Sequence, residues 1–129
     1  MFENCSNSNH QGNVGLASAI SWFTTQNHIV LLPLTDSQDY DLAVDMGDIK
    51  KVQVKTTKTK RDKAFTTDLR VRGGNRSGTG KTKHINTTQI DLLFILTEDG
   101  TKYLIPTKEL KSKQSRLNLG PKYNKFKIV

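Results

Sequence analysis

Apolar residues recur at helical spacing near the start of the chain. Val14, Ala17 and Ile20 follow one another at intervals of three, and this period predicts an amphipathic helix over residues 13–26. Asn13 is a suitable N-cap, because a side-chain oxygen at that position accepts free N–H groups of the first turn. We therefore expect a helix before the first strand.

Three strand-like segments follow this helix. Residues 28–33 are β-branched and leucine-rich and end at a proline, and residues 40–44 lead into a tight Met46-Gly47-Asp48 turn. Residues 49–57 then alternate, so that valines face one side of the strand while Gln53 and the neighbouring lysines face the other. This alternation predicts a strand with one buried and one polar face.

The second half of the chain predicts shorter elements. A hairpin joins residues 92–97 to residues 103–105 through Glu98-Asp99-Gly100. The remaining elements expected are a short strand at 65–71, a turn at 86–89, a short helix from Thr107 to residue 113 and a strand at 126–129.

These elements fit one α/β domain. With 129 residues the chain is large enough for a single core, and no internal repeat or domain boundary interrupts it. We expect a mixed β-sheet flanked by helices over residues 1–129. Residues 1–12 are polar and turn-rich and are expected to be poorly ordered, and residues 58–83 are expected to form a basic loop or ribbon.

Positive charge is concentrated in one part of the chain. The chain has 20 Lys and Arg against 12 Asp and Glu, a net charge of +8, and residues 50–83 hold twelve basic and two acidic residues. One interpretation is a solvated loop, and the other is a surface that neutralises nucleic-acid phosphates. Residues 58–83 contain one aromatic, Phe65, which favours double-stranded DNA over an RNA module that stacks bases. The candidate DNA-binding residues are Lys58, Lys60, Arg61, Lys63, Arg70, Arg72, Arg76, Lys81 and Lys83.

Several other functional classes find no support in the pattern. The N-terminus has no basic stretch followed by an apolar one, and the longest apolar runs are too short to span a bilayer, so no membrane role is expected. The lone Cys5 cannot form an internal disulfide, which favours a cytoplasmic protein. Gly80-Lys81-Thr82 ends like a P-loop but lacks the earlier glycine, and the three histidines lack metal-ligand spacing.

One group of polar residues is suited to metal chemistry. Asp41 lies within an apolar segment, where a carboxylate is costly unless it is paired or binds a metal. Gln53 and Lys55 share the polar face of the next strand, and pairing through the intervening turn brings these side chains together. Asp41, the Gln53 amide oxygen and the Val54 carbonyl are donors of the kind that Mg²⁺ prefers. Lys55 can stabilise charge on a phosphate, or simply form a salt bridge with Asp41.

The order of these residues resembles a known family. Tyr40-Asp41-Leu42, followed by Val52-Gln53-Val54-Lys55-Thr56, is similar to the PD-(D/E)XK nuclease superfamily, and Gln53 matches the QxK variant that includes group I intron-associated homing endonucleases. Gly12-Asn13-Val14-Gly15 resembles the family's first helix, and Tyr103-Leu104-Ile105-Pro106 resembles part of its C-terminal half. The resemblance implies a restriction endonuclease-like core and a Mg²⁺-dependent endonuclease of double-stranded DNA, with Mn²⁺ as an alternative metal.

The resemblance also implies roles for single residues. Asp41 resembles the metal-binding aspartate, Gln53 the amide of the metal site and Lys55 the catalytic lysine. Members of the family commonly carry a glutamate in the first helix, but residues 13–26 contain no acid, and Asn13 offers only an amide oxygen there. A carboxylate from elsewhere could complete the site.

Asp91 is a second acid that stands before an apolar strand, where the family pattern often has one. We interpret it as a turn or cap residue that accepts nearby backbone N–H groups. The leading functional hypothesis is thus a metal-dependent DNA endonuclease that hydrolyses phosphodiester bonds. The missing helix acid keeps open a catalytically inactive DNA-binding protein of the same fold, and a Holliday-junction resolvase is a further alternative. Because a domain this small has a limited footprint, we expect a homodimer or homotetramer.

Overall fold

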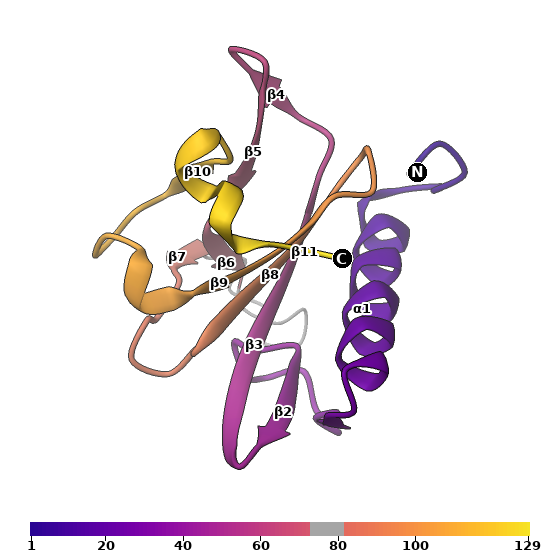
Figure 1. Cartoon of the computed structure of the whole chain (residues 1–129), viewed down its shortest axis with the longest axis vertical. Helices are drawn as coiled ribbons and strands as arrows, with labels where there is room; N and C mark the ends of the chain where they lie inside the picture. Colours follow the sequence, from indigo (N-terminus) through magenta and orange to yellow (C-terminus); the bar gives the residue numbers. More distant parts are fainter. Residues whose placement is uncertain (73–81) are drawn as a thin grey trace.

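The computed structural model describes residues 1–72 and 82–129, which form a single body around a central sheet (Figure 1). In chain order the elements are the helix α1 (Ser8–Thr25), β1 (Ile29–Leu31), β2 (Leu42–Met46), β3 (Asp48–Thr57), β4 (Lys60–Arg61), β5 (Ala64–Asp68), β6 (Arg70–Arg72), β7 (Thr82–His84), β8 (Leu92–Thr97), β9 (Lys102–Pro106), the 3₁₀ helix η1 (Thr107–Glu109), β10 (Arg116–Asn118), the 3₁₀ helix η2 (Pro121–Phe126) and β11 (Lys127–Ile128).

The central sheet is mixed, as predicted. Its strand order is β1-β2-β3-β8-β9-β11, and only the β3–β8 pair is parallel, running from Val52 opposite Leu92 to Thr57 opposite Thr97. Smaller sheets form from β10-β5-β4 and from β6-β7. Because β3 and β8 are parallel, the chain must cross over between them, and the segment that does so carries β4 to β7.

Strand β8 lies at the centre of the core and is buried on both faces. Alternate residues of a strand point to opposite sides, so Phe94 and Leu96 pack under α1 while Leu93 and Ile95 pack against the C-terminal half. The Phe94 ring lies 6.2 Å from that of Phe23 on the helix. This run of apolar residues therefore joins two hydrophobic clusters.

Helix α1 approaches the sheet closely at Gly15. A Cβ built on Gly15 would lie 2.4 Å from the Thr56 Cγ2 atom and 3.3 Å from the Val54 Cγ1 atom. A real side chain at this position would push the helix off β3, so the glycine sets the distance between the two elements.

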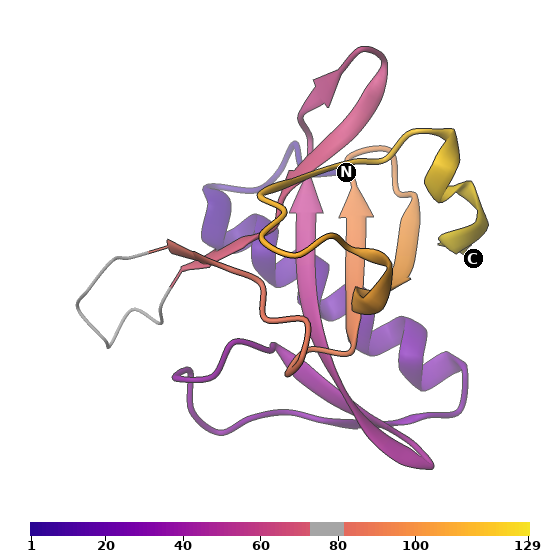
Figure 2. The same ribbon diagram turned by 90° about the vertical axis from the view of Figure 1, so that its left-hand side faces the viewer.

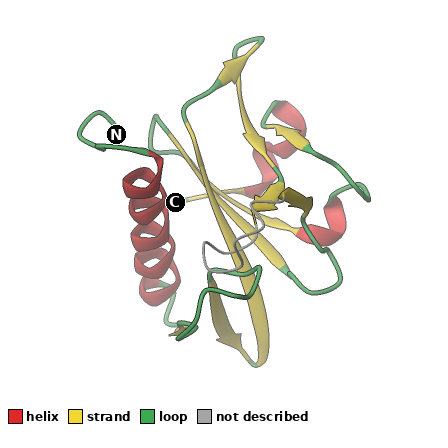
Figure 3. Cartoon of the chain, turned by 180° about the vertical axis from the view of Figure 1, so that it is seen from behind, coloured by secondary structure: helices red, strands yellow, loops and turns green. Residues whose placement is uncertain are grey.

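The opposite face of the sheet is not covered by helices of the expected kind. In the described part of the chain, α1 is the one α-helix, and the other face is covered by small strands and 3₁₀ turns that bury Leu117, Leu119 and Tyr123 (Figure 3). The helix predicted to start at Thr107 is wrong, since η1 ends at Glu109. The Thr107 hydroxyl donates to the Ile90 carbonyl and does not accept N–H groups as a cap would.

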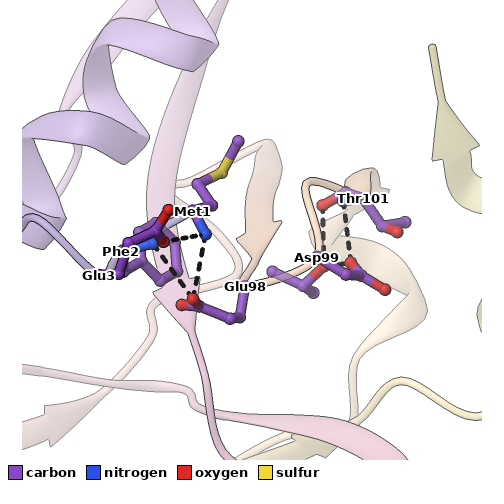
Figure 4. Close-up of polar contacts among 7 residues, drawn as sticks. Met1, Phe2, Glu3, Glu98, Asp99 and Thr101 are labelled. Atoms are coloured by element: carbon purple, nitrogen blue, oxygen red, sulfur yellow. Dashed lines mark hydrogen bonds and ion pairs between the residues drawn. The ribbon is translucent and has the colours of Figure 1, made fainter.

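The N-terminus differs from expectation. Asn7 rather than Asn13 is the N-cap of α1, and its side chain accepts the His10 N–H at 2.9 Å. Residues 1–12, for which we expected little order, include the buried Phe2 and the first turn of α1. The Met1 amino group and the Phe2 N–H both donate to the Glu98 carboxylate, at 3.1 and 3.2 Å (Figure 4). The buried Phe2 side chain and the two hydrogen bonds to Glu98 thus attach the N-terminus to the β8–β9 turn.

Two predicted turns are confirmed, and in each of them a glycine adopts the backbone conformation that the turn requires. Gly47, between β2 and β3, has φ of 92°, and Gly100, between β8 and β9, has φ of 86°. Side chains rarely tolerate this left-handed region, which glycine occupies freely. The turn fixes the register of β2 on β3, from Met46 opposite Asp48 to Leu42 opposite Val52. Asp41 therefore precedes β2, and its expected place within a strand is wrong.

Part of the basic segment forms a protruding ribbon. β4 and β5 pair as an antiparallel hairpin at one end of the molecule (Figures 1 and 2), and the turn between them places Asp62 and Lys63 at φ of 51° and 70°. The strand expected at 65–71 is divided at Leu69 into β5 and β6. No helix in the described ranges is long and apolar enough to cross a bilayer.

Candidate active site

Asp41 lies where β2 begins, and it binds the edge of β3 in two ways. Its backbone N–H donates to the Val52 carbonyl at 2.9 Å. Its carboxylate oxygen Oδ2 accepts the Val54 N–H at 2.7 Å. The register of β2 on β3 ends at Val52, so the carboxylate occupies the place that a further strand residue would otherwise take.

Gln53 contacts the same carboxylate oxygen. Its amide Nε2 donates to Asp41 Oδ2 at 2.9 Å, and the side chain is 6% exposed. Its amide oxygen, Oε1, is buried and has no hydrogen-bond partner among residues 1–72 and 82–129. A buried acceptor left unpaired costs about 1–3 kcal/mol, so this oxygen requires an explanation.

A divalent cation fits these donors. Because the N–H and C=O of one strand residue point to the same side, the Val54 carbonyl lies on the Asp41 side of β3. Asp41, Gln53 Oε1 and this carbonyl are hard oxygen donors, which suit Mg²⁺ with water completing its shell. The described residues contain no cluster of three or more His, Cys, Asp or Glu, so a metal held here binds one carboxylate and neutral oxygens.

Lys55 lies two positions along β3 from Gln53, on the same face. Its Nζ donates to the Arg70 carbonyl at 2.8 Å and forms no ion pair with Asp41, so that simple salt bridge is absent. Burial lowers the pKa of Lys55, while the charges of Asp68 and then Asp41 oppose this shift. Burial also raises the pKa of Asp41, against the Val54 N–H and the Lys55 charge. The site thus holds two partly desolvated charges.

A groove of about 420 Å³ opens beside Lys55. It is lined by hydroxyl groups of the β3 end and β5, and by four residues that the sequence did not single out as site residues: Ser8, Gln11, Asp68 and Arg116. Gln11 Nε2 donates to the Thr56 hydroxyl at 2.9 Å. This hydrogen bond links α1 to the end of β3. Asn13, the helix residue expected near the site, is exposed and does not line the groove. The absence of an acid holds for all of α1.

The described candidate DNA-binding residues fall into two groups, four on or near the ribbon and two engaged within the protein. Lys58, Lys60, Arg61 and Lys63 are exposed on or near the β4–β5 ribbon, and the Lys60 ammonium lies 4.7 Å from the Phe65 ring centroid. Two others are engaged within the protein: Arg70 donates to both Asp68 oxygens at 3.0 Å, and Lys83 forms an ion pair with Asp39 at 3.0 Å. Arg76, Lys81 and the Arg72 side chain lie outside the described residues.

Asp91 behaves as the expected cap residue. Its Oδ2 accepts the Lys51 N–H at 2.9 Å, and its own N–H donates to the Lys51 carbonyl at 2.9 Å. These bonds stand at the start of the parallel β3–β8 ladder. Asp91 therefore holds the register of the two central strands.

Comparison with known proteins identifies the fold and the family of the chain. A structure of the bacterial homing endonuclease I-Ssp6803I matches with a TM-score of 0.71 and 23% sequence identity, over 94% of this chain and 87% of that one. This likeness shows a shared fold. A search of curated protein sequences gave no match. The model of the PD-(D/E)XK endonuclease family matches residues 6–128. The chain therefore belongs to the PD-(D/E)XK endonuclease family, whose members hydrolyse phosphodiester bonds of DNA.

Proposed function

We propose that this protein is a Mg²⁺-dependent, homing-endonuclease-like enzyme that cuts double-stranded DNA, with Mn²⁺ as an alternative metal. The observation that carries the proposal is the buried, unpaired Oε1 of Gln53 beside the Asp41 carboxylate. A site evolved only for stability would pair this oxygen, whereas a cation beside Asp41 satisfies it. The family's general use of divalent metals supports the same conclusion.

Asp41, Gln53 and Val54 are the residues that would hold the metal. When bound, Mg²⁺ supplies polarisation of the scissile phosphate and lowers the pKa of a bound water. Lys55 orients a phosphate oxygen or the attacking water through Nζ and stabilises the negative charge that develops on phosphorus. The Arg70 carbonyl accepts a hydrogen bond from Nζ at 2.8 Å, which restricts the orientation of the ammonium group.

The groove beside Lys55 suits the DNA backbone. Its hydroxyl groups and the cations Lys58 and Arg116 are the donors that proteins use for phosphates. The β4–β5 ribbon extends from the same end of β3 and adds exposed lysines. We infer that a strand passes through this groove while the ribbon holds the adjoining duplex. Each domain has one site, so cutting both strands favours a homodimer or homotetramer.

A catalytically inactive DNA-binding protein is the main alternative. It is favoured by one observation: α1 has no acid, and Gln11 occupies the end that faces the groove. A Holliday-junction resolvase is a second alternative, and it differs from our proposal in the DNA structure that it cuts rather than in the chemistry at Asp41.

A cleavage assay separates these possibilities. Supercoiled plasmids carrying a random-sequence library, and a synthetic four-way junction, are each incubated with the protein and Mg²⁺, Mn²⁺ or EDTA. We expect metal-dependent plasmid cutting that falls at least about 100-fold in Lys55→Ala. Lys108→Ala, which removes an exposed lysine away from the groove, is the matched control. Binding without cutting in either metal supports the inactive protein, and preferential cutting of the junction supports the resolvase.

A further inference from the structure

Exposed apolar side chains gather at one edge of the central sheet. Among the described residues, eight large hydrophobic side chains are exposed, and six of them lie between residues 29 and 49. We name these six the edge patch: Ile29, Leu31, Leu32, Leu34, Met46 and Ile49. The other two are the terminal residues of the chain. Scattered exposed apolar residues are ordinary, but their concentration at one site indicates an interaction surface.

The strand register makes part of the patch a continuous surface. Ile29 pairs with Asp45, and Asp45 pairs with Ile49, so these residues lie side by side on one face. Val30 packs under α1, which directs Ile29 and Leu31 to the opposite face. There they stay 65% and 43% exposed. The C-terminal segments that cover this face elsewhere lie towards the other end of the sheet (Figures 1 and 2).

The two edges of the sheet differ in how they are protected. β11, at one edge, is two residues long and includes an exposed lysine, Lys127, a common means of preventing strand addition. β1, at the other edge, reads Ile-Val-Leu, carries no charge and pairs with β2 alone among the described strands. The β1 edge is thus suited to accept another strand.

Charge excludes DNA from this edge and favours another copy of the chain. Residues 1–49 contain no Lys or Arg and six acidic residues, whereas residues 50–129 hold all twenty basic ones. The six acidic residues repel phosphates, whereas β1 itself carries no charge, so two copies that meet at this strand bring no charges of the strand together. The centres of protein interfaces are likewise depleted of charge, as are β1 and all of α1.

We propose that two copies of this chain associate through the edge patch, with β1 pairing antiparallel to β1 of the second copy. Antiparallel pairing of a strand with itself has two-fold symmetry, so one surface serves both copies. The pairing would extend the six-stranded sheet across the dimer axis and bury Ile29 and Leu31 against their counterparts. The choice of a second copy rests in part on the proposed function, which needs two active sites to cut both strands.

The test is the mass of the purified full-length protein in solution, measured without DNA by sedimentation equilibrium. We compare the wild type with Ile29→Lys/Leu31→Lys, with Ile49→Lys and with Val129→Lys. The last adds the same charge at an exposed apolar residue outside the patch. We expect the wild type and Val129→Lys to have at least twice the monomer mass. The patch variants should dissociate about 100-fold more readily, because they bring like charges together at the axis.

Folding of each variant is checked by circular dichroism. If the double variant unfolds, the mass of Ile49→Lys is compared with that of the wild type instead. A wild type that is monomeric at about 100 µM overturns the inference, and so does a patch variant that associates as tightly as the wild type. The proposed function fails separately. A dimer that does not cut DNA leaves the interface standing, whereas a monomer that cuts removes the interface and keeps the enzyme.

Discussion

The carboxylate of Asp41 accepts the backbone N–H of Val54 at 2.7 Å, so a side chain completes the hydrogen bonding of β3 where β2 ends. The same oxygen accepts the Gln53 amide N–H at 2.9 Å. The site is therefore built into the sheet itself, and its geometry depends on the β2–β3 register. The remaining buried oxygen, Gln53 Oε1, is the part of this arrangement that the protein alone does not satisfy.

Asp41→Asn should stabilise the metal-free protein. Burial raises the pKa of Asp41, so the folded state disfavours the ionised carboxylate, and this destabilisation is present above that pKa. Asparagine keeps an acceptor for the Val54 N–H without the charge. In EDTA at about pH 8, urea denaturation should show a gain in unfolding free energy on the order of 1 kcal/mol.

The pH dependence checks the cause of this gain. As the pH falls through the pKa of Asp41, the wild-type carboxyl becomes neutral, and the advantage of Asp41→Asn should disappear. Mg²⁺ should raise the stability of the wild type and have no effect on the variant, because binding to the folded state stabilises it. An advantage that persists to about pH 3 would contradict burial of the Asp41 charge as its source.

Gln53→Glu should make folding depend on metal. A second carboxylate beside Asp41 in a buried position leaves two like charges unpaired, which costs about 3 kcal/mol of unfolding free energy in EDTA. Mg²⁺ should restore more stability to this variant than to the wild type. Gln89→Glu, at an exposed turn residue, is the control and should change neither quantity. Equal melting temperatures of Gln53→Glu and the wild type in EDTA would argue against the assigned geometry.

Two glycines of α1 should respond to alanine in opposite directions. Gly12 has no atom within 4 Å of a built Cβ, so Gly12→Ala should stabilise the helix by roughly 0.5–1 kcal/mol. Gly15→Ala brings a Cβ against Thr56 and should cost roughly 1–3 kcal/mol. Thermal melts of the two variants test the close approach of α1 to β3. A Gly15→Ala protein as stable as Gly12→Ala would show that the helix does not dock in this way.

Arg116 should contribute to DNA binding as a phosphate contact. Arg116→Ala should weaken duplex binding without regard to sequence and reduce the slope of log affinity against log salt by about 0.9. Fluorescence anisotropy across a salt series measures this slope, with Lys108→Ala as the control. An unchanged slope would place the DNA outside the groove beside Lys55.

The central strands could be predicted because their signals are local. Alternation identified β3, and the glycine turns identified the β2–β3 and β8–β9 hairpins within a few residues. β10 and η2 carry too few apolar residues for a period to show, and Leu117, Leu119 and Tyr123 are buried in a cluster with residues from distant parts of the chain, including β8 and β9. The start of α1 was missed because Asn7 caps a polar first turn that the apolar period does not include.

The site could be predicted only in part, because some of its contacts are local in the sequence and others are not. Asp41 and Gln53 are joined by one short hairpin, so their contact follows from a register that the sequence indicates. The groove depends instead on the docking of α1 and the antiparallel pairing of β5 with β10, which bring Gln11, Asp68 and Arg116 to Lys55. These residues are far apart along the chain, and no local pattern places them together.

The central claim is that Asp41, Gln53 and Val54 form a divalent metal site, and a crystal soaked in Mn²⁺ tests it most directly. We expect an anomalous peak between the Asp41 carboxylate and the Val54 carbonyl, with the Gln53 amide oxygen at about 2.2 Å from the ion. The peak should be absent in Asp41→Asn. Manganese bound elsewhere, or an ordered site without manganese at saturating concentration, would contradict the account.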